Sequence, residues 1–152
     1  MTNYICINGK KTELTEEQLK QLGIEIPKAN PFARVQQKMP FYYITNKGKV
    51  EFGVELFDFQ CNALHDVANY CTDKKIMEQR ALHETLNRLL WRYAMKNGGE
   101  GNYEIAYNGN DFIVQNAIYQ YCGQTFVSHN VAENAIKEII KPFMEARPDF
   151  KF

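Results

Sequence analysis

Residues 73–97 read DKKIMEQRALHETLNRLLWRYAMKN, which is a long helix-forming stretch without Pro or Gly. Four apolar residues follow one another at steps of four, three and four: Leu82, Leu86, Leu89 and Tyr93. This spacing places them on one face of a helix. Thr72 or Asp73 can cap the start, and Gly98-Gly99 can end the helix in a left-handed conformation. The stretch therefore predicts one long helix whose apolar face packs across a sheet.

Shorter elements are predicted on both sides of this helix. Asn8-Gly9 is a strong hairpin turn signal, and Thr15 with Gln18 forms a capping box that begins a short helix ending at Gly23. Short strands joined by short turns pair antiparallel, so the fold class is predicted as α+β. The predicted organisation is one domain, 1–152, with an N-terminal hairpin and short helix at 1–24, a connector at 25–40, a hairpin at 41–57, the long helix at 73–97, strands at 103–127 and a C-terminal helix at 130–145.

Several details of these elements are specific enough to be tested. The second hairpin has apolar residues at every second position, namely Val50, Phe52, Val54 and Leu56. Residues 61–71 predict a further short helix. Asn130 and Glu133 match a capping box for the C-terminal helix, and Pro142 predicts that this helix kinks or ends near Lys141. The tail after Pro142 is expected to lie along the surface, with Phe143 and Met144 packed.

Composition and charge narrow the class of protein. Of the 152 residues, 45% are apolar and 24% are charged, which is typical of a soluble globular protein. Lys plus Arg and Asp plus Glu number 18 each, and this zero net charge weighs against a general nucleic-acid binder. No stretch is long and apolar enough for a membrane span, and the start lacks a secretory signal. We therefore expect a cytoplasmic protein with reduced cysteines.

One group of residues suggests a metal site. Cys61, His65 and Cys71 lie close together in the chain, and thiolate with imidazole is the ligand combination that zinc prefers. A fourth ligand would have to come from a distant position: His83, Cys122 or His129. The competing interpretation is that the cysteines are small buried apolar side chains and that His65 makes a polar contact. That interpretation is favoured, so no cofactor is expected.

No pattern for enzymatic catalysis is present in the sequence. The cysteines and histidines lack the flanking signature of a catalytic nucleophile. Asp66, Glu78 and Glu84 have no spacing that brings two carboxylates together. GGEG at 98–101 precedes a predicted strand, whereas a phosphate-binding loop precedes a helix. We therefore expect a protein that acts by binding and is not an enzyme.

The strongest candidate binding surface is a basic stripe on the predicted long helix. Arg88, Arg92 and Lys96 follow at four-residue steps, and Trp91 is adjacent. Like charges at this spacing are unfavourable by a few tenths of a kcal/mol, and an anionic partner would relieve that cost. Arg beside Trp is also typical of binding hot spots. The alternative is a solvated face on which Glu84 pairs with Arg88; the sequence does not choose between the two.

Several stretches together resemble small accessory proteins of phages and prophages of Gram-positive bacteria. These stretches are INGKKTELTEEQLKQLGI (7–24), NPF (30–32) with the following YYI (42–44), ANYCTDKK (68–75), ALHETLNRLLWRYAMKNG (81–98) and TFVSHNVAENAIKEI (125–139). They are structural residues, so the resemblance carries no site residues over. It implies a protein made in a bacterial host cytoplasm, where small phage proteins without enzyme signatures often antagonise host defence, as anti-CRISPR proteins do.

These observations favour a non-enzymatic viral protein that inhibits a bacterial defence system by binding a host protein, for example a CRISPR effector. One alternative is a sponge that sequesters a nucleotide immune signal with Arg88, Arg92, Lys96 and a stacking aromatic. Another is a nucleic-acid-associated replication or regulatory factor, against which the zero net charge counts. The sequence leaves open whether the chain forms a homo-oligomer.

Overall fold

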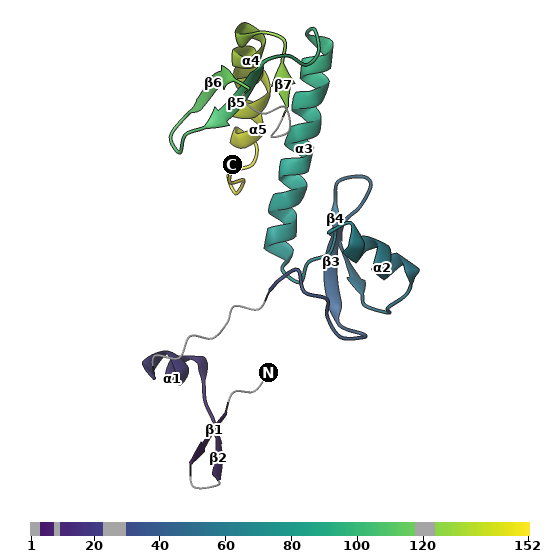
Figure 1. Cartoon of the computed structure of the whole chain (residues 1–152), viewed down its shortest axis with the longest axis vertical. Coiled ribbons are helices and arrows are strands. Elements are labelled where there is room, and N and C mark those ends of the chain that lie inside the picture. Colours follow the sequence, from purple (N-terminus) through teal and green to yellow (C-terminus); the bar gives the residue numbers. More distant parts are fainter. Residues whose placement is uncertain (1–3, 8–9, 23–29, 118–123) are drawn as a thin grey trace. The chain divides into compact units, whose positions relative to one another are not determined.

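The computed structural model describes residues 4–7, 10–22, 30–117 and 124–152 (Figure 1). Contacts between Cα atoms divide the chain into two units, Met1–Ala33 and Arg34–Phe152, where the sequence favoured one domain. Each unit is described by itself.

The first unit contains a hairpin and a short helix. Strand β1 (Tyr4–Ile7) pairs antiparallel with β2 (Lys10–Glu13), and α1 spans Glu16–Gln21. Thr15 and Gln18 form the predicted capping box, because the Thr15 amide donates to Gln18 Oε1 at 2.9 Å and the Gln18 amide donates to Thr15 Oγ at 3.3 Å. The predicted turn at residues 8–9 and the predicted helix stop at residue 23 lie outside the described residues.

The second unit contains two antiparallel sheets and the helices that cover them. Its elements are β3 (Pro40–Ile44), β4 (Val50–Val54), α2 (Phe59–Asp66), α3 (Lys74–Lys96), β5 (Tyr103–Tyr107), β6 (Phe112–Asn116), β7 (Thr125–Phe126), α4 (His129–Ala135), the π-helical turn η1 (Ile136–Ile140) and α5 (Lys141–Glu145). Strand β3 pairs with β4, and the second sheet has the order β6-β5-β7. The α+β class is confirmed. Residues 118–123 of the predicted strand region 103–127 lie outside the described residues.

The predicted long helix is present with the expected caps. The Asp73 carboxylate accepts hydrogen bonds from the amides of Lys75 and Ile76 at 2.8 and 3.2 Å. At the other end Gly98 has φ of +108°, and the amide of Gly99 donates to the Ala94 carbonyl at 2.8 Å. Gly is favoured at this position because a side chain would strain the left-handed backbone.

Helix α3 buries two opposite faces, one near each end. Met77 and Ala81 join Ile44 and Cys71 in one cluster, next to β3 and β4. A second, larger cluster contains the buried residues Leu86, Leu90, Ala94, Phe126, Ala132, Ala135, Ile136, Ile140, Phe143 and Phe150. Leu86 follows Met77 by nine residues, about two and a half turns of an α-helix, so the two side chains point in opposite directions.

The predicted apolar face is therefore only part of what α3 buries. Leu86 is buried in the larger cluster and Leu82, Leu89 and Tyr93 pack against it, as expected, but Leu90 and Ala94 are buried there as well. Met77 and Ala81, which lie on the other face, were not recognised because periodicity was read for one stripe only. A helix between two clusters presents a different stripe to each.

The hairpin β3–β4 is covered differently on its two faces. Phe41 stacks on Tyr70 with ring centroids 4.1 Å apart, and these two rings form a third cluster with Cys61 of α2. The facing position on β4 is Gly53, where an added Cβ would lie 2.8 Å from Phe41 Cζ. A glycine is required here because the Phe41 ring occupies the side-chain space.

The other face of the hairpin is only half covered. Ile44 and Val50 pack against the Met77 cluster, but Phe52 is 70% exposed and Val54 is also exposed. The predicted alternation of apolar residues in β4 is correct as a pattern, yet most of that face is open. The alternation of apolar residues did not determine which β4 side chains are buried, because α3 reaches only the Val50 end of the strand.

The C-terminal helix runs from His129 to Glu145 through η1 and α5, close to the predicted 130–145. Its cap is Ser128, whose hydroxyl oxygen accepts from the Val131 amide at 3.3 Å, and not the predicted Asn130. The helix also does not end near Lys141. Pro142 cannot donate to the preceding turn, and the wider π turn before it accommodates the ring while the backbone stays helical.

The tail is part of the core and does not only follow the surface. Phe150 is buried beside Phe143 at a centroid distance of 5.3 Å. The Gln79 side chain of α3 holds the tail backbone, because it donates to the Asp149 carbonyl at 2.7 Å and accepts from the Lys151 amide at 3.0 Å.

Replacing Leu86 by Ala tests the importance of the larger cluster. We expect Leu86→Ala to lower the free energy of unfolding by about 2–5 kcal/mol, because it leaves a cavity in a closely packed core. The matched control is Leu56→Ala, at an exposed position, for which we expect a change within about 0.5 kcal/mol. Urea unfolding followed by circular dichroism measures both, and equal effects would contradict this assignment of the core.

Candidate functional site

Arg88 and Trp91 lie together on the outer side of α3. They line a shallow hollow of about 350 Å³ with Asn87 and Gln124. Trp91 is 54% exposed, and Met95 on the next turn is also exposed. A Cβ added at Gly48 would lie 3.6 Å from Arg88 Nη1, so the turn of the β3–β4 hairpin reaches α3 at this arginine. Beyond Arg88 the same side of the helix presents Trp91 and Met95 to solvent.

The charge of Arg88 is partly neutralised by a carboxylate on its own helix. Glu84 pairs with Arg88 at 3.2 Å and with Arg80 at 3.1 Å, both at four-residue spacing. The predicted Glu84–Arg88 pair is therefore confirmed. Since this pair is exposed, it contributes little to stability. The local surface has one carboxylate between two guanidinium groups.

Arg92 and Lys96 belong to a different concave surface. They line a groove of about 620 Å³ that α3 forms with α4 and η1. The other residues of the groove are Leu89, Tyr93, Asn97, Asn134, Glu138 and Ile139. Burial, together with the carboxylate of Glu138, raises the pKa of the Tyr93 hydroxyl above its usual value.

The four predicted site residues thus divide into two pairs. Lys96 follows Trp91 by five residues, which turns its direction by about 140° around the helix axis. Trp91 faces the hollow with Arg88, whereas Lys96 faces the groove with Arg92. The sequence treated these residues as one stripe because it considered only the four-residue steps between the cations.

The three predicted zinc ligands are not brought together. Cys61 is buried in the Phe41 cluster, where burial raises the pKa of its thiol, and Cys71 is buried in the Met77 cluster. The rings of His65 and Tyr70 pack edge to face, with centroids 5.4 Å apart. Within residues 4–7, 10–22, 30–117 and 124–152, no three His, Cys, Asp or Glu side chains lie close enough to hold a metal ion.

The proposed fourth zinc ligands lie elsewhere as well. The ring of His83 packs on the ring of Phe150, with centroids 4.7 Å apart. His129 Nδ1 lies 3.8 Å from Glu133 Oε1. Cys122 lies outside the described residues.

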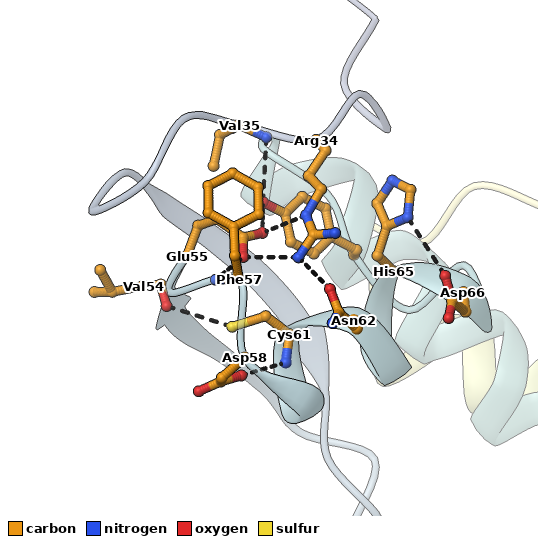
Figure 2. A network of polar contacts seen from close by, with 11 residues as sticks. Arg34, Val35, Val54, Glu55, Phe57, Asp58, Cys61, Asn62, His65 and Asp66 are labelled. Carbon is orange, nitrogen blue, oxygen red and sulfur yellow. Dashed lines mark hydrogen bonds and ion pairs between the residues drawn. The ribbon is translucent and has the colours of Figure 1, made fainter.

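An ion pair between a half-buried arginine and a buried carboxylate, which the sequence did not predict, joins three segments of the second unit (Figure 2). Arg34 binds Glu55 through two hydrogen bonds, from Nε to Oε2 at 3.1 Å and from Nη2 to Oε1 at 3.0 Å. The Glu55 side chain is fully buried, and it also accepts from the Tyr70 hydroxyl at 2.9 Å and the Phe57 amide at 2.7 Å. Arg34 donates further to Asn62 Oδ1 at 2.7 Å and lies 4.5 Å above the Phe57 ring.

This network holds local structure and is not arranged for proton transfer. Hydrogen bonds from Arg34, and then those from Phe57 and Tyr70, lower the pKa of Glu55 to about 2 although burial opposes ionisation. Both carboxylate oxygens are occupied by protein donors, so the group is a poor general base. Its interactions connect the segment before β3, the end of β4 and helix α2. Sequence reasoning missed the pair because its members are 21 residues apart and neither belongs to a recognisable motif.

Among the described residues, no helix is both long enough and apolar enough to cross a membrane. Comparison with known proteins finds no matching family model, no matching curated protein and no matching solved structure.

The stability of the protein should depend on the ionisation of Glu55. Its pKa is lowered from an ordinary value of 4.5 to about 2, so its contribution to stability is present above pH 4.5 and is lost as the pH falls toward 2. We expect Glu55→Gln to cost about 1–3 kcal/mol at pH 7 and to flatten the decline of stability over this pH range.

Urea unfolding between pH 2 and pH 7 measures this effect. Glu51→Gln is the control, because it removes an exposed carboxylate from β4, four residues before Glu55, and should leave the pH profile unchanged. Parallel profiles for the wild type and Glu55→Gln would show that the pair does not stabilise the folded state through its charge.

Proposed function

We propose that this chain is a non-enzymatic phage protein that inhibits a bacterial defence system by binding a protein effector, for example a CRISPR effector, in the host cytoplasm. The biological setting in this proposal comes from the sequence resemblance. The proposed mode of action, binding to a protein, is inferred from the exposed surface of α3. The exposure of Trp91 is the observation on which the proposal depends.

The contact surface consists of Arg88, Trp91 and Met95. Trp, Met and Arg are the residue types enriched where proteins bind one another, and Trp and Arg dominate measured hot spots. Met95 follows Arg88 by seven residues, about two helical turns, so it lies on the same side of the helix as Arg88 and Trp91. The three side chains therefore form one continuous strip beside the hollow at Asn87 and Gln124.

The strip also indicates what its partner should offer. An apolar pocket on the partner would cover Trp91 and Met95, and acidic groups at its rim would face Arg88 and Arg80. Glu84 already lies between these two arginines and offsets part of their charge. We therefore expect the partner surface to carry a moderate negative charge. A rigid helix needs little ordering when it binds, which reduces the entropic cost of association.

Substitution of Trp91 tests the proposed contact surface. We expect Trp91→Ala to weaken binding to the effector by about 30-fold or more, the effect of a hot spot worth about 2 kcal/mol. Arg88→Glu should also weaken binding through charge reversal. The measurements are a pull-down against purified CRISPR effectors and other defence proteins, followed by inhibition of the target cleavage of any bound effector.

Matched controls separate binding from folding. Phe59→Ala removes another exposed aromatic residue, and Lys75→Glu reverses an exposed charge near the start of α3. Both should retain full binding, and all four variants should keep the thermal stability of the wild type. The proposal fails if no effector in the panel binds, or if Trp91→Ala and Arg88→Glu bind as tightly as the wild type.

A further inference from the structure

The groove between α3 and the C-terminal helix has the dimensions of a small-molecule site. Its volume of about 620 Å³ falls within the range of roughly 300–1,000 Å³ that is common for ligand pockets. Leu89, Ile139 and the ring of Tyr93 provide apolar surface, and the other five lining residues are polar or charged. Polar groups at fixed positions give a small ligand its orientation.

Arg92 and Lys96, the two cations of the groove, are exposed. Among the described residues, neither of their side chains forms an ion pair or a hydrogen bond. This differs from Arg80 and Arg88, which share Glu84. Two like charges four residues apart are mutually unfavourable on a helix, and a phosphate or carboxylate bound between them removes that cost.

The groove also contains a carboxylate that limits which anions fit. Glu138 lies close to the Tyr93 hydroxyl, whose pKa it raises together with burial. A second negative group of a ligand near Glu138 would be repelled, whereas hydroxyl or amino groups could donate to it. A ligand that satisfies both sides of the groove therefore has an anionic end and a hydrogen-bond-donating end.

Ribonucleotides have this combination of groups. Their phosphate matches Arg92 and Lys96, and ribose hydroxyls are commonly bound by a protein carboxylate, which Glu138 supplies. Asn134 adds a carboxamide that can both donate and accept hydrogen bonds. Asn97 already donates to the Tyr93 carbonyl at 2.8 Å, which fixes its side chain at the end of the groove.

We propose that the groove formed by α3, α4 and η1 binds a ribonucleotide, with its phosphate on Arg92 and Lys96 and its ribose hydroxyls on Glu138. This site does not include Arg88 or Trp91, so it is independent of the protein-binding surface. It also differs from the nucleotide site that the sequence suggested, since that site included Arg88 together with Arg92 and Lys96 and stacked the base on Trp91 or a tyrosine.

Calorimetric titration of the full chain tests the proposal. The ligands are the four ribonucleoside 5′-monophosphates, their 2′-deoxy counterparts, the uncharged nucleosides and inorganic phosphate. We expect at least one ribonucleotide to bind about tenfold or more tightly than its deoxy counterpart, its nucleoside and phosphate. Arg92→Gln and Lys96→Gln should each weaken that binding by about tenfold, and Glu138→Ala should remove the preference for the ribonucleotide.

Arg88→Gln is the matched control, because it removes a guanidinium from the same helix outside the groove. It should leave nucleotide affinity unchanged, and circular dichroism should show all variants folded. The proposal is overturned if no ribonucleotide binds, if inorganic phosphate binds as tightly, or if the Arg92 and Lys96 variants retain wild-type affinity. None of these results would affect the pull-down with effectors, which depends on Trp91.

Discussion

Met77 and Leu86 lie on opposite sides of α3, and the packing of the second unit depends on this arrangement. One helix serves two hydrophobic clusters, and each cluster contacts a different face because the contacts are nine residues apart. The β3–β4 hairpin is held at the start of the helix and the β5–β7 sheet with α4 and η1 near its end. Both proposed binding surfaces use residues of α3 that stay exposed: Trp91 with Arg88 in one, and Arg92 with Lys96 in the other.

This arrangement explains how α3 can be a core element and also present exposed side chains. The side of the helix that is buried at Met77 and Ala81 continues past the hairpin turn at Gly48 and becomes the exposed strip with Trp91. An exposed tryptophan on a helix held at both ends is rigidly presented. Trp91 is exposed because it lies beyond the point at Arg88 that the hairpin turn reaches.

The Arg34–Glu55 pair has a different part in the structure. Removing the Glu55 carboxylate from water is costly, so an ion pair of this kind often stabilises a protein no more than apolar residues of the same size would. Here every oxygen of Glu55 accepts a hydrogen bond, so the group is compatible with only one arrangement of its neighbours. The pair thereby fixes the position of α2 against the hairpin, where Phe41 and Tyr70 provide the apolar contact.

The sequence by itself determined the local elements, because caps, turns and periodicity act over a few residues. Asp73 and Gly98 define the ends of α3, and the strands at 103–107 and 112–116 follow from their own composition. Only the tertiary structure decided which faces are buried. Phe52 has the right spacing for a core position but no helix covers it, and Phe150 in the tail is buried because Gln79 and the aromatic cluster hold it. The same reason explains why the four predicted site residues divide into two pairs. The sequence shows their spacing along α3. The neighbouring hairpin and α4–η1 determine that Arg88 and Trp91 face one surface and Arg92 and Lys96 another.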